Sequence, residues 1–481
     1  MKKPELVFVP LPGIGHLVSA VEFAKALLNH DERFSVTILR FNYPFQLTLD
    51  SNTLHSLSSS HAQIQFLEVP EPRHPPPLEL LSKSREAFHS LYIESNKPEV
   101  KEVIVNHVST RPVKLAGVVL DMFCSSMDDV AKELQVPSYV FFASGAGFLG
   151  FMLYLHTRHE KGGTVFENSD PDSDIASYTN SVPAKVLPNL AFSKEGGYIS
   201  FVKHSQRFKK TNGIIVNTVL ELESHAVGSL LDGVTPPVYT VGPVIDLEGK
   251  SQLRSSENQR DKIMTWLDNQ PPRSVVFLCF GSYGTFSGPQ LREIAIGLEK
   301  SGQRFLWSVR KTPSKNEYGV PSTEFENFGD SFPEGFLERT KELGLICAWA
   351  PQVEVLAHKA IGGFVSHCGW NSILESLWFG VPIVTWPLYA EQQLNAFQMV
   401  GDMGLALELR LDSRKDGGEI VMGGEIEKAV RSVVDGDCDI RRRVEEMSGI
   451  CKRAVEDGGS SCESFRSLID AMLANISLDD S

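Results

Sequence analysis

A chain of 481 residues is too long for one ordinary hydrophobic core, so we expect two or three domains. Hydrophobic residues at 42% and charged residues at 22% are typical of a soluble globular protein. The formal net charge of −14 argues against nucleic acid and anionic membranes as partners, although it is compatible with an anionic ligand in a local positive pocket.

The N-terminal sequence MKKPELVFVPLPGIGH predicts a first strand rather than a signal peptide, because prolines and glycines break its short apolar run. The longest apolar stretch, Tyr139 to Leu155, has a Ser-Gly-Ala-Gly turn in its middle, so it predicts a strand, a turn and a helix rather than a membrane span. Scattered cysteines, odd in number and never spaced as C-x-x-C, indicate free thiols rather than disulfides or a zinc site. The seven are Cys124, Cys279, Cys347, Cys368, Cys438, Cys451 and Cys462. We expect a cytoplasmic monomer.

Continuous apolar runs separated by helical patterns follow one another along most of the chain, which is typical of a parallel sheet covered on both faces. In the first half, the expected strands are 5–13, 34–41, 62–69, 114–123, 137–144, 213–218 and 238–242, and the first helices are 16–30 and the region 77–108. In the second half, the expected strands are 274–282, 304–310, 344–350, 361–367 and 382–387, and the final sixty residues are mostly helical.

A polar segment without periodicity separates the two halves, and we interpret residues 243–260 as a linker. The predicted fold class is α/β, with two facing, doubly wound Rossmann-like domains at 1–242 and 261–460. Residues 461–481 are expected to form a C-terminal helix and tail that packs back on the first domain. Such sheets bind ligands at the carboxyl ends of their strands, so we expect the active site in the cleft between the domains.

The sequence FVSHCGWNSILES, residues 364–376, predicts a buried strand that runs directly into a helix. Free N–H groups and the dipole at a helix N-terminus favour negative charge, so an anion is expected there. Three other strand ends in this half carry polar or aromatic groups: Ser282, Trp349 with Gln352, and Tyr389 with Glu391 and Gln392. All should meet at the same edge of the sheet.

From Trp349 to Gln392 the sequence resembles the signature box of the plant secondary-product UDP-glycosyltransferases (family 1, GT-B fold), and it is most similar to glucosyltransferases of small phenolics and flavonoids. The resemblance implies a UDP-sugar site in which Trp349 stacks on uracil and Glu375 binds both ribose hydroxyls. His367 and the helix N-terminus would hold the diphosphate. The implied UDP-sugar-binding residues are Ser282, Trp349, Ala350, Gln352, His367, Trp370, Asn371, Ser372, Glu375, Glu391 and Gln392. A glutamine at the last place of the box, Gln392, favours UDP-glucose.

His16 follows the first predicted strand in a glycine-containing turn, and Asp121 ends another strand. The resemblance assigns His16 as the general base and Asp121 as its partner. Chemistry agrees, because the unperturbed pKa of histidine, about 6.5, suits proton removal from a hydroxyl at neutral pH. A buried aspartate on the other ring nitrogen would fix the tautomer. One in-line displacement would invert the α-linked donor to a β-glucoside, with no metal and no other cofactor.

Two features qualify this interpretation. Ala143 stands where many relatives carry a threonine that touches the donor, and Ser144 could substitute for it.

Gly13 and Gly15 begin a dinucleotide fingerprint, but Val18 occupies its next required position, and no acidic residue ends the second strand. A Rossmann oxidoreductase is therefore disfavoured, and a non-catalytic small-molecule binding protein of the same fold is the alternative to an enzyme.

The expected reaction is therefore transfer of glucose from UDP-glucose to a hydroxyl of a small hydrophobic acceptor, a flavonoid or another phenolic, with terpenoids as further candidates. A phenol ionises far more readily than an alkyl alcohol, which suits a histidine base. The predicted acceptor-binding residues are Ile14, Gly15, Met122, Phe123, Phe142, Phe148 and Tyr389.

Overall fold

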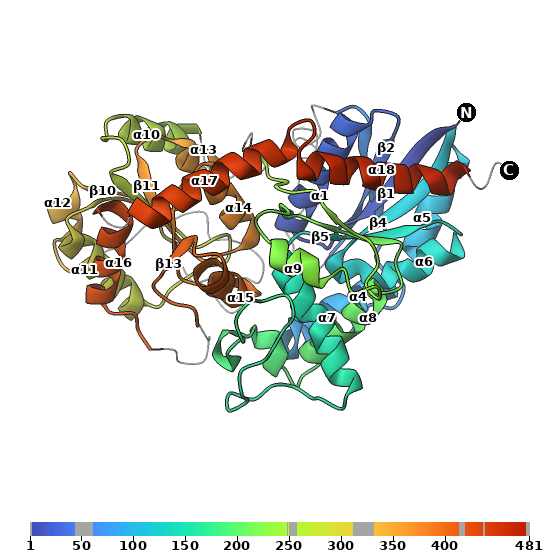
Figure 1. Cartoon of the computed structure of the whole chain (residues 1–481), viewed down its shortest axis with the longest axis horizontal. Coiled ribbons are helices and arrows are strands. Elements are labelled where there is room, and N and C mark those ends of the chain that lie inside the picture. Colours follow the sequence, from blue (N-terminus) through green and yellow to red (C-terminus); the bar gives the residue numbers. More distant parts are fainter. Residues whose placement is uncertain are drawn as a thin grey trace. The chain divides into compact units, whose positions relative to one another are not determined.

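The structure is a computed structural model that describes residues 2–43, 61–247, 249, 257–310, 331–412, 419–435 and 438–477 (Figure 1). The chain divides into two compact units. The first comprises Met1–Ala184, Asn189–Asp246 and Arg453–Ser481, and the second comprises Lys185–Pro188 and Leu247–Lys452.

The first unit is built on a parallel sheet of seven strands in the order β3-β2-β1-β4-β5-β6-β7. The strands are β1 (Lys3–Val9), β2 (Ser35–Phe41), β3 (Ile64–Val69), β4 (Val113–Asp121), β5 (Ser138–Phe142), β6 (Gly213–Val216) and β7 (Val238–Thr240). Its helices are α1 (Ile14–His30), α3 (Glu79–Lys83), α4 (Arg85–Ser95), α5 (Lys97–Ser109), α6 (Asp128–Glu133), α7 (Ala146–Glu160), α8 (Gly197–Phe208), α9 (Ser224–Ser229) and α18 (Ser460–Ser477). Its short 3-10 turns are η1 (Met122–Met127) and η3 (Asn189–Phe192), whereas η2 (Ala184–Val186) begins at Ala184 and continues into Lys185–Pro188 of the second unit.

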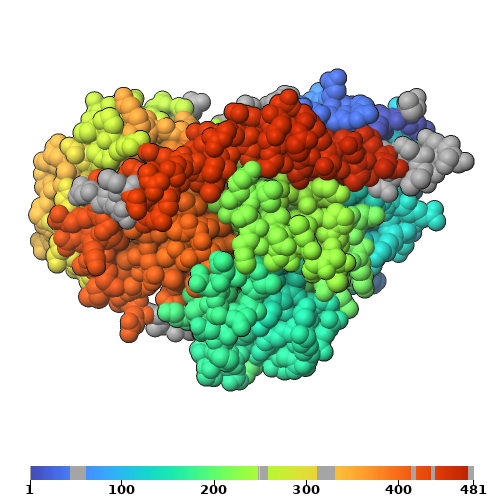
Figure 2. Space-filling model, viewed as in Figure 1, coloured from blue at the N-terminus to red at the C-terminus, as the bar shows by residue number. Residues whose placement is uncertain are grey.

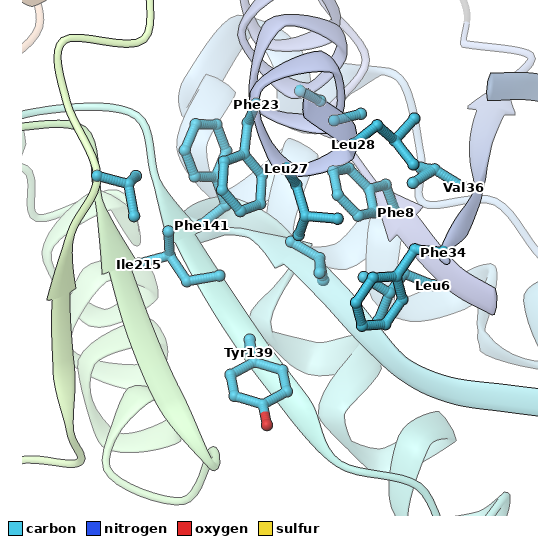
Figure 3. Close-up of a cluster of buried hydrophobic side chains, with 14 of the residues drawn as sticks. Leu6, Phe8, Phe23, Leu27, Leu28, Phe34, Val36, Tyr139, Phe141 and Ile215 are labelled. Atoms are coloured by element: carbon cyan, nitrogen blue, oxygen red, sulfur yellow. The ribbon is translucent and has the colours of Figure 1, made fainter. Parts of the chain in front are cut away.

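Successive residues of β1 face opposite sides of this sheet, as the two-residue period of a strand requires. Leu6 and Phe8 join a buried cluster with residues of α1 and α18, whereas Val7 and Val9 join a second cluster with residues of α5 and α6. Both faces are therefore covered, which explains why the strands read as continuous apolar runs. Figure 3 shows the first cluster, in which Phe23 of α1 stacks on Phe141 of β5 at a centroid distance of 4.7 Å.

The last helix of the chain, α18, belongs to the first unit. Phe465 is 3% exposed and stacks on Phe23 at 5.9 Å and on His30 at 4.4 Å. Just before it, the Ser461 hydroxyl donates to the carbonyl of Gly242 over 2.5 Å. Figure 2 shows α18, in dark red, on the surface of this unit beside the green segment that carries α9. The C-terminal segment of this unit starts at Arg453, ahead of the boundary at residue 460 expected from the sequence.

The second unit repeats the architecture with six parallel strands in the order β10-β9-β8-β11-β12-β13. The strands are β8 (Val275–Cys279), β9 (Arg304–Ser308), β10 (Gly344–Cys347), β11 (Ile361–Ser366), β12 (Ile383–Thr385) and β13 (Ala406–Glu408). The helical elements are α10 (Glu257–Asp268), α11 (Gly288–Ser301), α12 (Phe336–Thr340), α13 (Gln352–Ala357), α14 (Trp370–Trp378), α15 (Gln392–Phe397), the π-helical turn η5 (Gln398–Asp402), α16 (Gly423–Asp435) and α17 (Cys438–Val455).

Local sequence explains where helices of this unit start and stop, and α11 is an example. The Ser287 hydroxyl accepts the N–H of Gln290, Pro289 lies in the first turn, and Gly302 ends the helix with φ of 63°. Buried residues of α11 and α16 pack on one face of the sheet against Leu278 and Trp307.

The predicted α/β class with two Rossmann-like domains is confirmed by these two doubly wound parallel sheets. Two details differ from the sequence analysis. The strand β13 was not predicted, and α10 begins at Glu257, inside the segment interpreted as a linker. Of that segment, residues 248 and 250–256 lie outside the described part of the chain.

Candidate active site

In the second unit, the carboxyl ends of the parallel strands carry most of the residues singled out in the sequence. Ser282 follows β8, Trp349 follows β10, His367 follows β11, and Gln392 follows β12. Because all six strands are parallel, these ends meet at one edge of the sheet, as predicted.

The turn between β11 and α14 has the form expected of an anion site. Cys368 adopts φ of 61°, and its backbone N–H donates to the Ser366 hydroxyl over 3.1 Å. Gly369 is the N-cap of α14 and supplies no side-chain cap to the helix. An anion at this helix N-terminus would therefore meet no competing side-chain cap at Gly369.

His367 lies beside this turn and is 6% exposed. Its Nδ1 atom is buried without a hydrogen-bond partner among the described residues. Burial, assisted by the charge of Arg310, lowers its pKa to about 3, so the ring is neutral at neutral pH. A buried ring nitrogen without a protein partner is costly unless something else binds to it, which makes His367 a candidate ligand residue.

Two glycines make room for the His367 ring. A Cβ atom at Gly281 would lie 2.4 Å from Nε2 of His367, and one at Gly369 would lie 2.7 Å from the same atom. Gly281 also adopts φ of 71°, a conformation that L side chains rarely adopt. Gly281 therefore requires glycine for both space and conformation, and Gly369 for space alone.

Gln352, Ser372 and Glu375 form one hydrogen-bonded group. The side-chain amide of Gln352 donates to the Ser372 hydroxyl over 2.8 Å and to Oε2 of Glu375 over 2.6 Å. Glu375 is only 8% exposed although it carries a carboxylate. The amide orients this carboxylate, whose remaining acceptor positions suit paired hydroxyl donors.

The loop after β12 is fixed by Gln392, which is 2% exposed. Its Oε1 atom accepts the backbone N–H groups of Leu388 and Tyr389, each over 2.9 Å. Burial raises the pKa of Tyr389 to about 12, and its ring centroid lies 6.1 Å from that of His367. Tyr389, predicted as an acceptor residue, thus belongs to the second unit and neighbours His367.

The remaining predicted residues of this group lie in the same region and differ in exposure. Ala350 and Trp370 are buried, whereas Ser282, Trp349, Asn371 and Glu391 are half-buried.

The sequence analysis missed Arg310, which follows β9 and is 7% exposed. Its guanidinium carbon lies 4.2 Å from the ring centroid of Trp349, and Nη1 donates to the carbonyl of Gly281. The signal was present in the sequence, because RFLWSVR ends an apolar strand with a basic residue at the same edge of the sheet.

The first unit holds the other predicted pair. Nδ1 of His16 lies 2.7 Å from Oδ2 of Asp121, and the Asp121 side chain is 3% exposed against 28% for His16. The other oxygen of the carboxylate accepts the N–H of Phe123 over 2.9 Å. When Nδ1–H donates to the aspartate, Nε2 is the ring's acceptor atom, which suits a proton acceptor. His16 lies in the first turn of α1, which begins at Ile14, rather than in the turn before the helix.

The predicted acceptor residues of the first unit differ in exposure. Ile14 and Phe123 are half-buried and Gly15 is exposed, so they could face a ligand near His16. Met122, Phe142 and Phe148 are at most 4% exposed and pack within the interior. Sequence periodicity does not separate an interior phenylalanine from one that lines a site, because both are apolar.

Two aromatic residues that were not predicted from the sequence, Phe201 and His204, pack against Phe123, which in turn contacts His16. The Phe123 ring lies 5.7 Å from His16, 5.5 Å from Phe201 and 5.9 Å from His204, measured between ring centroids. Burial lowers the pKa of His204 to about 4, and burial together with the charge of His16 lowers that of His89 to about 4. His16 therefore contacts Phe123, and behind Phe123 lies a cluster of aromatic rings that includes the neutral imidazole of His204.

One helix N-terminus of the first unit is closed to anions. Glu223 is 2% exposed, and its carboxylate accepts the N–H groups of Ala146 and Gly147 at the start of α7, over 2.7 and 2.9 Å. Ser144, suggested as a substitute for the missing threonine, is 1% exposed, and Ala143 is half-buried. The contrast with α14 supports the second unit as the place where an anion binds.

Two features are absent from the described residues. No group of three or more His, Cys, Asp or Glu side chains in that part of the chain could hold a metal ion. No helix within the same ranges is long and apolar enough to cross a membrane.

Comparison with known proteins places this geometry in context. Residues 239–438 match the family model described as UDP-glucoronosyl and UDP-glucosyl transferase. The sequence is 51% identical to UDP-glycosyltransferase 71K1 of Malus domestica, over 98% of this chain and 99% of the relative. It is 45% identical to UDP-glucose flavonoid 3-O-glucosyltransferase 6 of Fragaria ananassa, over 98% of both chains. The crystal structure of UGT71G1 of Medicago truncatula, complexed with UDP-glucose, is 47% identical and superposes with a TM-score of 0.88 over 98% of both chains.

Proposed function

The chain belongs to the UDP-glycosyltransferase family, and on that premise we propose that it is an inverting glucosyltransferase that moves glucose from UDP-glucose to a hydroxyl of a small phenolic acceptor. The single observation that carries this proposal is the 2.7 Å contact between His16 and the buried Asp121, because binding alone requires no proton acceptor.

The second unit supplies the donor site in this proposal. Uracil stacks on Trp349 beside Ala350, and the ribose hydroxyls donate to Glu375, which Gln352 orients. The diphosphate lies beside Nδ1 of His367 and accepts hydrogen bonds from N–H groups at the start of α14, near Asn371 and Ser372. Ser282, on the loop after β8, completes this binding of the phosphates.

Sugar recognition is assigned to Trp370, Glu391 and Gln392. Gln392 already uses Oε1 for two backbone N–H groups, so its amide N–H₂ is the part that can donate to sugar hydroxyls. Glu391 would accept from sugar hydroxyls, and its negative charge disfavours an acidic sugar. The UDP-glucose in the complex of the Medicago relative is consistent with a glucose donor.

The chemical step is a single displacement at the anomeric carbon. As the acceptor oxygen forms its bond to that carbon, the bond to the phosphate oxygen breaks, and UDP leaves with the electron pair. The hydroxyl proton passes to Nε2 of His16, and Asp121 stabilises the resulting imidazolium. Attack opposite to the leaving group converts the α-linked donor to a β-glucoside. The start of α14 stabilises the departing phosphate, so no metal is assigned a role.

A phenolic acceptor is favoured by the surroundings of His16. The Phe123 ring packs edge-on to His16, and Phe201 and His204 continue the aromatic environment. The Fragaria relative is by name a flavonoid 3-O-glucosyltransferase, which points to the same acceptor class. Ile14 and Gly15, which precede His16 at the start of α1, are assigned to the acceptor. Met122, Phe142 and Phe148 are not, because they are at most 4% exposed and pack within the interior.

A panel assay tests the proposal. The purified protein is incubated with UDP-glucose, UDP-galactose or UDP-glucuronate and with flavonoids, simple phenols or terpenoid alcohols, and UDP release and product anomer are measured. We expect the highest kcat/KM for UDP-glucose with a phenol, a β-linked product, and the lowest rate for UDP-glucuronate. An α-linked product would refute the inverting mechanism, and a preference for UDP-galactose would refute the donor assignment. If the protein binds UDP but no acceptor leads to release of UDP from a UDP-sugar, the non-catalytic binding protein is favoured.

A further inference from the structure

Arg310 connects three strand ends of the second unit. It follows β9, its guanidinium carbon lies 4.2 Å from the ring centroid of Trp349 after β10, and its Nη1 donates to the carbonyl of Gly281 after β8. At 7% exposure, the side chain is held within the protein rather than on its surface. A planar guanidinium can stack on an indole while its edge donates hydrogen bonds, so one side chain serves both contacts.

The stacked guanidinium covers one face of the Trp349 ring. Trp349 nevertheless remains half-buried, so part of its surface stays accessible. The Trp349 carbonyl accepts from Nε2 of Gln259 over 2.9 Å, which holds the backbone at this residue. Gln259 holds the backbone and Arg310 covers one ring face, so a flat partner would stack on the opposite face of the indole.

The second contact of Arg310 reaches the loop that precedes Ser282. Gly281 adopts φ of 71°, and a Cβ atom there would lie 2.4 Å from Nε2 of His367. The position of the Gly281 carbonyl therefore affects both the space around His367 and the direction of the chain toward Ser282. The charge of Arg310 also contributes to lowering the pKa of His367, in agreement with their proximity.

We propose that Arg310 is a positioning residue of the nucleotide site, which braces the Trp349 ring on the face away from the base and at the same time fixes the Gly281–Ser282 loop. This inference rests on the proposed function, in which uracil stacks on Trp349. It assigns Arg310 no contact with the reacting atoms, so its effect should lie in nucleotide affinity rather than in the chemical step.

The experiment compares Arg310→Met and Arg310→Lys with the wild type by isothermal titration calorimetry, using uridine and UDP as separate probes. Methionine retains much of the stem but removes the stacking cation and the donor, and we expect Kd to rise by about tenfold for both probes. Lysine keeps the charge but lacks the planar guanidinium, so the Kd values of Arg310→Lys should lie between those of the wild type and Arg310→Met. The KM for UDP-glucose should rise by a similar factor, with kcat and the acceptor KM within about twofold of wild type.

Arg441→Met is the matched control. Arg441 also donates from a partly buried position to backbone carbonyls of the second unit, those of Gly362 over 3.0 Å and Val433 over 2.8 Å. Gly362 lies near the start of β11, whereas the proposed site lies at the carboxyl ends of the strands. Arg441→Met should therefore leave the Kd values of uridine and UDP unchanged.

The two probes separate the inference from its rivals. Weaker UDP binding with unchanged uridine binding would overturn it, because Arg310 would then act by its charge on the diphosphate. Tighter uridine binding to Arg310→Met would overturn it as well, because the guanidinium of the wild type would then compete with uracil for the Trp349 ring. Unchanged affinities in folded variants would overturn this inference alone. A wild-type protein that bound neither probe would overturn the proposed function together with it.

Discussion

His16 and Asp121 form a pair in which the histidine is 28% exposed and the aspartate is 3% exposed, with 2.7 Å between Nδ1 and Oδ2. The aspartate is held at both oxygens, since Oδ1 accepts the N–H of Phe123. The imidazole is therefore oriented from its buried side, and when Nδ1–H donates to Asp121 its acceptor atom is Nε2.

His16→Ala should lower kcat by at least about a hundredfold for a phenol of ordinary acidity, since general base catalysis typically contributes about 10²–10⁴-fold. Asp121→Asn should be less harmful, because the aspartate orients the ring rather than accepting the proton. Steady-state kinetics with phenols of decreasing pKa provide the measurement, and the deficit of His16→Ala should shrink along the series. The affinity for UDP serves as the control and should not change. A folded His16→Ala variant with near-normal rates on a weakly acidic alcohol would contradict the assignment.

Gly281→Ala should weaken UDP binding by about tenfold or more. The new Cβ atom would lie 2.4 Å from Nε2 of His367, and the residue would keep a positive φ, so the loop or the ring must shift. Gly288→Ala is the control, because a Cβ atom there would meet no atom within 4 Å. Equal UDP affinities for the two variants, measured by calorimetry, would show that the Gly281 loop does not shape the site.

Activity should survive treatment with EDTA. The diphosphate is assigned to the start of α14 and to His367, and no cation is needed to offset its charge. Initial rates with and without chelator, followed by addition of magnesium or manganese, are the measurement. If activity is lost and either metal restores it, a cation rather than the helix N-terminus stabilises the leaving group.

The free energy of unfolding should fall as the pH drops below about 6.5. Burial lowers the pKa of His89 and His204 to about 4 and that of His367 to about 3, below the value of about 6.5 expected on unfolding. The unfolded chain thus binds more protons between these values, so the stabilisation is complete above pH 6.5 and is lost toward pH 4. Each group contributes a slope of about 1.4 kcal/mol per pH unit.

His204→Gln tests this linkage, because it removes one of the three groups and leaves the others in place. Urea denaturation between pH 4.5 and 7 should give a slope smaller by about 1.4 kcal/mol per pH unit than in the wild type. An unchanged slope would mean that His204 is not held neutral in the folded protein.

Much of the fold could be predicted from sequence because strands buried on both faces read as uninterrupted apolar runs, as in 274–282 around β8. The strand β13 escaped prediction because it is short, and its residues Ala406, Leu407 and Glu408 are buried, half-buried and exposed in turn. The resemblance assigned Asp121 as the partner of His16, and the structure has the two side chains in contact. Arg310 was missed because its contacts reach Trp349 and Gly281, which are distant in sequence.

Phe465→Ala should destabilise the first unit by about 3–5 kcal/mol, the usual cost of truncating a buried phenylalanine. Phe465 is 3% exposed and stacks on Phe23 and His30. The neighbouring Arg466 is exposed and pairs with Asp457 and Glu463, so Arg466→Ala should cost less than about 1 kcal/mol. Thermal and urea unfolding measure the stability of both variants. Equal losses of unfolding free energy in Phe465→Ala and Arg466→Ala would argue against a packing role for α18.

The place of α18 in the first unit has a consequence for synthesis on the ribosome. Residues up to Asp246 leave the exit tunnel long before Arg453–Ser481, yet both segments belong to the same unit. Until the final helix is released, the Phe23 side of α1 lacks the aromatic ring of Phe465 that covers it in the finished protein. The nascent first unit must therefore wait for the second unit to be translated, and a premature stop codon that removes only the last helix would leave its apolar surface open to chaperones and to aggregation.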